Sequence, residues 1–378
     1  MIFFSRFLGR VLLCVAVLSA VAAESPLGRF VGTPACASSS CHGGAGPRRA
    51  QSGEWESRDV HRRAASTLNS ARSEQIARAL GLTNAVGQAR PADQLQCTVC
   101  HAPNATVPAS QRRVVLDPTE GVGCETCHAP AESWLRSHTR PGPPRDDFTY
   151  QDKVAAGLRD LRDLRARANV CVACHENVDR AILLAGHPEL NFELDGQTRQ
   201  EPRHWVELPG FQGPQAWLVG QAVAAREVAW WMTREDQKSA LLSARAVSLD
   251  WLVSRAAGAL GIAATDPDTI ARLVAGRRWT EADTTHVLVA LAGAGREFRP
   301  SGIPAQVQAH RAERLVLGLD RLVAARPGGL PKTADDALNA LFKRVQWRAD
   351  FETELFANEL DTLFDRLKTA GLGTGMGP

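Results

Sequence analysis

The sequence predicts a mainly α-helical protein with a loop-rich N-terminal part and an all-helical C-terminal part. Strand-like alternation of apolar and polar residues is rare along its 378 residues. Cysteine pairs occur only between residues 36 and 175, and helix-like patterns fill most of the chain beyond them. Gly and Pro interrupt the sequence at LPGFQGPQ, residues 208–215, where we place the boundary between the two parts.

The first 23 residues have the features of a secretory signal peptide. Arg6 and Arg10 precede an apolar run, and small residues over 20–23 suit cleavage. The apolar run is too short for an ordinary membrane span, although a retained N-terminal anchor is the alternative. We therefore expect an exported protein with a signal peptide at 1–23, a first domain at 24–210 and a helical domain at 211–378.

The cysteine pairs repeat one pattern, in which a histidine directly follows the second cysteine. Three of them have the spacing C-x-x-C-H, the attachment signature of a c-type haem. Their members are Cys97, Cys100 and His101; Cys124, Cys127 and His128; and Cys171, Cys174 and His175. In such a site the two sulfurs bind the porphyrin and the histidine binds the iron as proximal ligand.

The stretch VGTPACASSSCHGG, residues 31–44, contains a longer version of the same pattern. Cys36 and Cys41 are separated by four small residues, and His42 follows. The two extra residues can form a bulge away from the porphyrin, so we interpret this stretch as a fourth attachment site. A decayed site is the alternative.

Zinc and iron–sulfur sites also use paired cysteines, but neither requires a histidine directly after each pair. The sequence has nine cysteines, and Cys14 lies in the signal segment. The other eight all belong to the four pairs, which leaves none for a structural disulfide. Four covalent haem c groups in an exported chain indicate the bacterial periplasm.

The second axial ligand of each iron can be argued by elimination. Methionine is the usual alternative to histidine at a cytochrome iron. The chain has three methionines, and only Met232 lies inside an ordinary structural segment. The candidate distal ligands are the four remaining histidines of the first domain: His61, His138, His187 and His204. We expect structural roles for His286 and His310.

Several motifs together resemble a known family. They are the opening stretch, the spacing of Trp55, His61 and Ala64, the three C-x-x-C-H sites, and GHPELNFEL followed by PRHW. The combination resembles the multihaem cytochrome c family that includes the tetrahaem cytochrome c-554, the electron acceptor of hydroxylamine oxidoreductase. The resemblance implies closely packed haems, mostly with two histidine ligands, and allows one iron with an open position.

These observations favour an electron carrier that passes electrons between redox partner proteins. An oxidoreductase acting on a small nitrogen or sulfur compound at one five-coordinate haem is the alternative, so the sequence leaves enzymatic activity undecided. The helical domain is also a candidate docking unit for a larger redox complex. The net charge is only +3 and the basic residues are scattered, so we expect no nucleic-acid partner and a soluble or peripherally membrane-associated protein.

Helix signals can be placed in both parts. In the first, SEQIARALG should end at Gly81, and DKVAAGLRDLRDLRARA should form one helix leading into the last cysteine pair. In the second, capping residues precede two of the expected helices, Asp266 with Pro267 and Thr280 with Asp283. The tryptophans of this part are expected in the core: Trp217, Trp230, Trp231, Trp251 and Trp347. A tryptophan-rich partner surface is the alternative.

Overall fold

The structure is a computed structural model that describes residues 28–47, 49–84, 86–196, 203–299 and 302–372. The expected signal peptide, with Cys14, lies outside these residues. The mainly α fold is confirmed, because the structure is 60% helical and its described residues contain no strand. In the described ranges, β structure is limited to two isolated bridges, Phe30 with Arg112 and Thr83 with Ala89.

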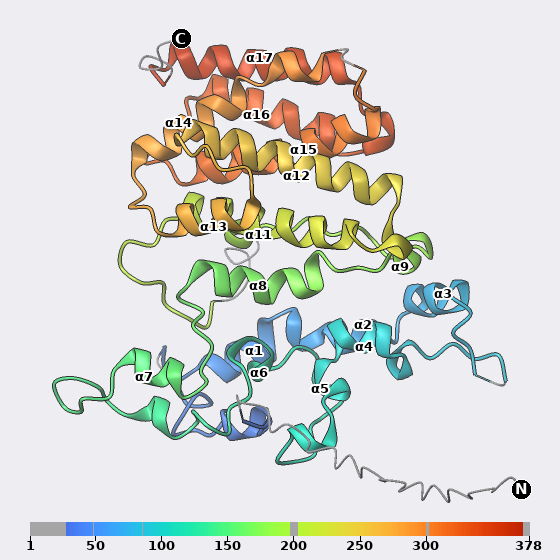
Figure 1. The fold of residues 1–378 in the computed structure, drawn as a ribbon, viewed down its shortest axis with the longest axis vertical. Helices are drawn as coiled ribbons and strands as arrows, with labels where there is room; N and C mark the ends of the chain where they lie inside the picture. The colour runs from blue at the N-terminus through green and yellow to red at the C-terminus, as the bar shows by residue number, and fades with distance from the viewer. Residues whose placement is uncertain (1–27, 48, 85, 197–202, 300–301, 373–378) are drawn as a thin grey trace, which may run out of the picture.

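The first part consists of short helices joined by loops (Figure 1). Its α-helices are α1 (Gln51–Arg58), α2 (Ala64–Thr67), α3 (Ala71–Ala79), α4 (Leu95–His101), α5 (Pro103–Thr106), α6 (Cys124–His128), α7 (Tyr150–Ala155), α8 (Leu164–His175) and α9 (Arg180–Leu184). Single turns of 3₁₀ helix lie before and between them: η1 (Thr33–Ala35), η2 (His61–Arg63), η3 (Pro91–Asp93), η4 (Ala109–Gln111) and η5 (Ser137–Thr139). The cysteine pairs therefore belong to short elements that loops can bring together.

The second part is a stack of longer helices, seen in the upper half of Figure 1. They are α11 (Gly213–Met232), α12 (Ala240–Ala259), α13 (Pro267–Ala275), α14 (Glu281–Ala292), α15 (Ala305–Ala324), α16 (Lys332–Val345) and α17 (Thr353–Thr369), with 3₁₀ turns η6 (Glu235–Gln237), η7 (Gly295–Phe298) and η8 (Arg348–Asp350). None of the helices in the described ranges has both the length and the apolar character needed to cross a membrane.

The predicted capping residues are confirmed. Asp266 accepts a hydrogen bond from the backbone N–H of Thr269 at the start of α13, and Thr280 and Asp283 form a reciprocal capping box at the start of α14. Gly81 follows the end of α3 with a φ of 71°, the left-handed conformation that glycine adopts without strain. Short local signals thus set where these helices begin and end.

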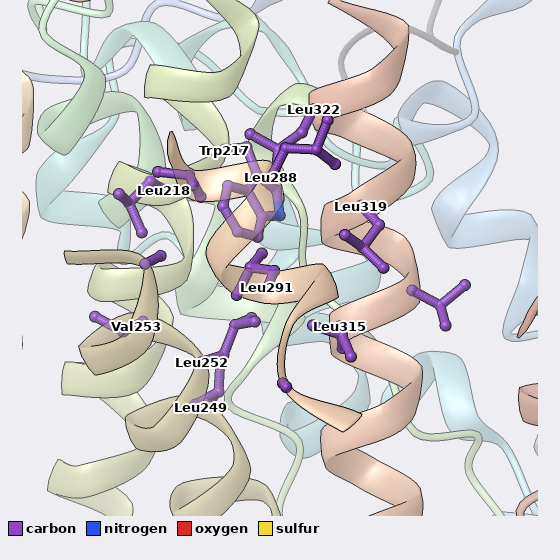
Figure 2. Packing of buried hydrophobic residues seen from close by; sticks show 14 of the residues in the cluster. Trp217, Leu218, Leu249, Leu252, Val253, Leu288, Leu291, Leu315, Leu319 and Leu322 are labelled. Carbon is purple, nitrogen blue, oxygen red and sulfur yellow. The ribbon is translucent and has the colours of Figure 1, made fainter. Parts of the chain in front are cut away.

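The core of the second part is built from leucine and valine side chains of α11, α12, α14 and α15 around the fully buried Trp217 (Figure 2). Gly318 of α15 makes this packing possible. A β-carbon at this position would lie 2.5 Å from Cζ2 of Trp217, closer than side chains allow. The indole ring therefore packs directly against the backbone of α15.

The helix expected before the last cysteine pair is wrong as a single element. The structure has α7 and α8 instead, separated by a loop over 156–163. Gly157 has a φ of 111°, which breaks the helix, and Asp163 then caps α8 by accepting from the backbone N–H groups of Arg165 and Ala166. The apolar spacing alone predicted one helix, because it does not register the break at Gly157 or the new N-cap at Asp163.

The expectation that all five tryptophans are core residues is partly wrong. Trp217 is fully buried, and Trp231 and Trp251 pack against the core. Trp230 is 49% exposed and Trp347 is 67% exposed. Trp230 and Trp231 are neighbours on α11, and a helix cannot turn two adjacent side chains to the same face.

Helix α8 and the segment after it pack against the second part. Ala168 and Val172 of α8, with Phe192 and Leu194 further along, belong to the same core cluster as α11. Gly220 of α11 permits the close approach, because a β-carbon there would lie 2.8 Å from Cβ of Leu194. The last cysteine pair is therefore carried by a helix that is anchored on the helical half.

Candidate functional site

Three of the predicted attachment sites lie on α-helices. The pairs of residues 97–101, 124–128 and 171–175 occupy α4, α6 and the C-terminal end of α8. In a helix, residues three and four positions apart lie on one face, so both cysteines and the histidine point to the same side. This geometry explains why the C-x-x-C-H spacing suits attachment to a single flat ring.

The longer first site forms a compact turn instead. The N–H of His42 donates to the carbonyl of Cys36 at 3.1 Å, and the N–H of Cys41 donates to Ser38 at 2.9 Å. Gly43 lies so close to the turn that a β-carbon there would be 1.9 Å from the carbonyl oxygen of Ala37. The two extra residues are thus folded into the turn, which keeps His42 next to Cys36.

One cavity of about 1210 Å³ is lined by all the predicted site residues. Its cysteines are Cys36, Cys41, Cys97, Cys100, Cys124, Cys127, Cys171 and Cys174, and its histidines are His42, His61, His101, His128, His138, His175, His187 and His204. A cavity for one small ligand has a volume of roughly 300–1,000 Å³. Its size and its repeated set of thiols and imidazoles suit several large cofactors.

Three proximal histidines each face one of the candidate distal histidines. The ring centroids are 6.2 Å apart for His42 and His138, 6.3 Å for His175 and His61, and 6.2 Å for His101 and His187. An imidazole nitrogen binds a transition metal at about 2 Å, so two imidazoles on opposite sides of one metal have centroids roughly 6 Å apart. The spacing leaves room for one metal ion between each pair of rings.

His128 and His204 form the fourth proximal and distal combination. His128 is at the end of α6, and both rings line the cavity. Burial lowers the pKa of His128 to about 4. The structure therefore brings three proximal and distal histidines face to face and places the fourth combination in the same cavity.

Several of these rings are oriented by a hydrogen bond at Nδ1. His138 Nδ1 contacts the carbonyl of Leu135 at 2.6 Å, and His187 Nδ1 contacts that of Pro188 at 2.8 Å. His61 Nδ1 lies 3.1 Å from Oδ1 of Asp59, a buried carboxylate. A hydrogen bond at Nδ1 fixes the tautomer, which leaves Nε2 as the nitrogen available to a metal.

The protonation of the buried rings also suits metal binding. Burial is the leading cause that lowers the pKa of His101, His138, His175 and His204, besides His128. These imidazoles are consequently neutral at neutral pH, and the neutral form is the one that binds iron. The thiols, the paired rings and their protonation together fit covalently attached haem.

Cysteines of different attachment sites are in contact. A hydrogen bond with Cys124 and burial raise the pKa of the Cys36 thiol, and a hydrogen bond with Cys100 and burial raise that of Cys174. The first site therefore adjoins the third, and the second adjoins the fourth. This packing agrees with the expectation that the cofactors lie close together.

The sequence analysis missed three residues that hold the site together. Asp59 orients His61, Glu125 accepts from the backbone N–H groups at positions 31, 32 and 131, and Arg159 Nη1 donates to the carbonyls of Thr126 and Cys127. The role of Asp59 could have been predicted, because an acid two residues before a candidate ligand can hydrogen-bond to that histidine. The role of Arg159 could not, because its partners lie more than thirty positions away in the sequence.

Paired thiols followed by an axial imidazole are the groups that hold the haem in c-type cytochromes. Residues 35–129 match the model of the family described as cytochrome c554 and c-prime, which confirms the resemblance to the multihaem family of cytochrome c-554. The match runs from the residue before Cys36 to the residue after His128, so it includes the first site with its longer spacing. No curated protein and no solved structure matches the chain.

The family match supports the general chemistry that the site indicates. It supports a c-type cytochrome with an electron-transfer role, and the family implies iron held in covalently attached haem c. When bound, the haem supplies one-electron redox chemistry. The protein supplies the thiols, the axial imidazoles and the groups that orient them.

Proposed function

We propose that this protein is a periplasmic tetrahaem cytochrome that transfers electrons between redox partners. The observation that carries the proposal is the arrangement of three facing histidine pairs in one cavity, which His128 and His204 also line. Each of four histidine combinations would hold one iron: His42 with His138, His101 with His187, His175 with His61, and His128 with His204. Imidazole on both sides of the iron favours a low-spin carrier over a site with an open position.

The proposed organisation follows the sequence. Residues 1–23 would direct export, residues 24–210 would carry the four haems, and residues 211–378 would form the helical domain. The packing of α8 on α11 supports a close association of the two parts. Docking of a redox partner through the helical domain belongs to the same proposal.

Methionine ligation has little support from the structure. Met232 packs against the helical core, where Oγ of Ser243 lies 3.9 Å from its sulfur. Met232 is not among the residues that line the cavity. Histidine pairs are therefore the ligand set that the described residues favour.

Haem stoichiometry tests the number of attachment sites. Haemochrome absorbance and intact mass should give four haems per chain. Replacing Cys36 and Cys41 together with alanine should remove one haem and leave three. Three haems in the unaltered protein, with those two thiols unmodified, would refute the fourth site.

Spin state separates the electron carrier from the enzyme. We expect four low-spin irons in the oxidised protein and no carbon monoxide binding after reduction. Replacing His61, His138, His187 or His204 singly with alanine should convert one haem to high spin and allow it to bind carbon monoxide. A high-spin iron in the unaltered protein would instead indicate an oxidoreductase with one open haem.

A further inference from the structure

The segment 175–195, called the ligand strip below, joins the haem cavity to the helical half. It carries His175 and His187, which face His61 and His101. Between and beyond these two histidines, polar side chains of the strip reach into the second part of the protein. Two of the four proposed irons thus depend on a segment that contacts both parts. The carbonyl of Gly186 accepts from Arg72 of α3, whereas Asn177 and Asn191 donate to Glu227 and Glu313 of the helical half.

The first contact is a buried charge cluster beside His175. Glu176 directly follows that histidine, and its side chain is fully buried. It accepts a hydrogen bond from Nη2 of Arg245 on α12, and Nη2 of Arg314 on α15 lies 3.5 Å from its other oxygen. Both arginine side chains are at most 4% exposed. Two guanidinium groups against one carboxylate leave a net positive charge inside the protein.

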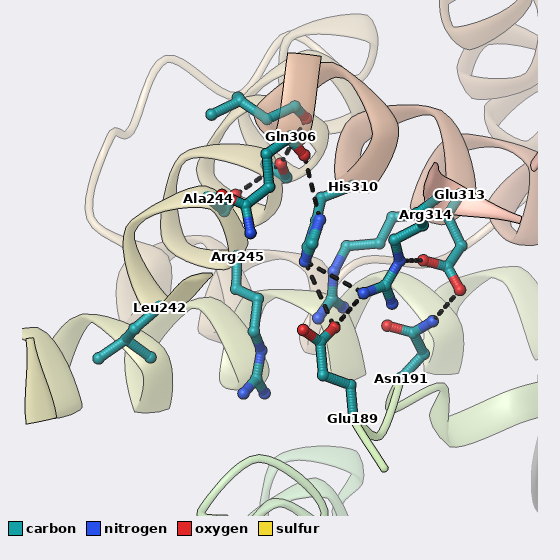
Figure 3. Close-up of polar contacts among 12 residues, drawn as sticks. Glu189, Asn191, Leu242, Ala244, Arg245, Gln306, His310, Glu313 and Arg314 are labelled. Atoms are coloured by element: carbon teal, nitrogen blue, oxygen red, sulfur yellow. Dashed lines mark hydrogen bonds and ion pairs between the residues drawn. The ribbon is translucent and has the colours of Figure 1, made fainter. Parts of the chain in front are cut away.

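The second contact lies beyond His187, where Arg348 is shared by two carboxylates, those of Glu189 and Glu313. Glu189 accepts a hydrogen bond from Arg348 of η8, and its carboxylate is 3.3 Å from Nε2 of His310 on α15. Asn191 donates to Glu313 of α15 at 2.6 Å. Figure 3 shows Glu189 and Asn191 reaching from the strip toward His310 and Glu313.

A third set of bonds holds the strip against α11. Nε2 of Gln221 donates to the carbonyl of Phe192 at 2.7 Å, and Nε1 of Trp217 donates to Glu193 at 3.1 Å. Phe192 and Leu194 are both 1% exposed. The strip is therefore anchored at its C-terminal end by apolar burial, with charged contacts one residue after His175 and two residues after His187.

We propose that the helical half sets the reduction potentials of the two haems bound through the ligand strip. Arg245 and Arg314 act on the haem of His175 and His61 through Glu176, and Arg348 acts on the haem of His101 and His187 through Glu189. These arginines are positioning residues, because each acts through a strip residue one or two positions after a ligand. The inference rests on the histidine pairs of the proposed function.

The sign of the effect follows from electrostatics. An oxidised haem iron carries one more positive charge than a reduced one, so a buried cation nearby favours reduction and raises the potential. A buried anion has the opposite effect. Removing Arg245 should therefore lower the potential of one haem, and neutralising Glu176 should raise it.

The test uses the complete holoprotein in a spectroelectrochemical titration of all haems. We expect Arg245→Met to lower one potential and Glu176→Gln to raise the same one. At a fixed applied potential, each change should alter the oxidised-to-reduced ratio of that haem about tenfold. This corresponds to a shift of about 59 mV in its reduction potential, for a one-electron couple. The double variant should return close to the potential of the unaltered protein, because both charges are then absent.

Arg255→Met is the matched control. Arg255 lies on α12 like Arg245, but its partner Glu297 belongs to η7 and not to the ligand strip. The Arg255→Met variant should leave the reduction potentials of all four haems unchanged. Arg348→Met should lower the potential of a different haem, the one that becomes high-spin in His187→Ala. Arg245→Met should lower the potential of the haem that becomes high-spin in His61→Ala.

Equal shifts of all haems, no shift, or shifts of the same sign for Arg245→Met and Glu176→Gln would overturn the proposal. If Arg245→Met does not fold, Arg245→Lys keeps the charge and should preserve the potential, while Glu176→Gln still raises it. A failure of the proposed function is visible separately, because the unaltered protein would then lack four low-spin haems. A failure of this inference leaves those four signals intact.

Discussion

The imidazole rings of His42 and His138 are nearly parallel, with centroids 6.2 Å apart and planes inclined by only 18°. The corresponding angle is 71° for His61 and His175 and 69° for His101 and His187. The pairs share one spacing but differ in the relative orientation of their rings. Because each ring is oriented by its own surroundings, the angle is a property of the protein scaffold.

The difference in ring angles predicts different electron paramagnetic resonance spectra. Nearly parallel imidazole planes split the iron d orbitals and give a rhombic low-spin signal, whereas nearly perpendicular planes give a highly axial signal with a large maximum g value. We expect one rhombic signal from the His42 and His138 pair and at least two axial signals from the others. The oxidised protein at low temperature provides the measurement.

His138→Ala identifies the rhombic signal. The variant should lose it and gain one high-spin signal, while the axial signals remain. Loss of an axial signal in this variant would contradict the assigned pairing.

The close approach of Gly43 to Ala37 predicts a selective defect in the first attachment site. A β-carbon at Gly43 would lie 1.9 Å from a backbone oxygen, and backbone cannot move aside cheaply. Gly43→Ala should therefore open the turn and reduce haem attachment at Cys36 and Cys41, leaving about three haems on most chains. Intact mass of the purified protein gives the distribution.

Gly53→Ala is the control for this change. Gly53 lies on α1, and a β-carbon there would meet no atom within 4 Å. The substitution should keep all haems, with an effect on the free energy of unfolding between zero and a gain of about 0.5–1 kcal/mol. An equal haem loss in both variants would show that the tight turn is not the cause.

The buried carboxylate of Asp59 predicts a low potential for the haem of His61 and His175. Burial favours the neutral acid, but the hydrogen bonds with His61 lower the pKa of Asp59 overall, so it is ionised at neutral pH. An anion accepting from Nδ1 makes the ligand more basic and stabilises the oxidised iron. Asp59→Asn should raise this potential and leave the other haems in place, as followed by redox titration.

Gln51→Glu offers the reverse experiment. Oε1 of Gln51 lies 3.1 Å from Nδ1 of His42, so a carboxylate there should lower the potential of the His42 haem. If Asp59→Asn and Gln51→Glu moved their potentials in the same direction, ligand basicity would not be the controlling factor.

The attachment sites were predictable because the residues that define each site lie close together in the sequence. Two cysteines and a histidine within five to seven residues define each site, and capping signals such as Thr280 with Asp283 are equally short. The histidine pairing was not predictable, because His42 and His138 meet only through the fold. The contact of Glu176 with Arg245 spans 69 positions and has no sequence signal. Apolar spacing also failed at Gly157, where a positive φ outweighed the helical pattern.

Glu193 predicts a pH-dependent contribution to the stability of the helical half. Burial raises the pKa of this carboxyl from 4.5 to about 7 in the folded protein. Between these values the unfolded chain releases the proton while the folded protein retains it. The stabilising contribution is therefore complete below about pH 4.5 and is lost as the pH rises through about 7. The free energy of unfolding should fall over this window because of Glu193.

Glu193→Gln should remove this part of the pH dependence. The amide stays neutral at every pH and can still accept from Nε1 of Trp217, which lies 3.1 Å from Oε1 in the native protein. Guanidinium unfolding of the holoprotein, followed by circular dichroism from pH 4 to pH 8, should give a flatter curve for this variant and higher stability than the unaltered protein above pH 7. The exposed Glu354 of α17 is the control, because its replacement by glutamine leaves the buried carboxyl in place and should preserve the original slope. An unchanged slope in Glu193→Gln would mean that this carboxyl does not remain protonated in the fold.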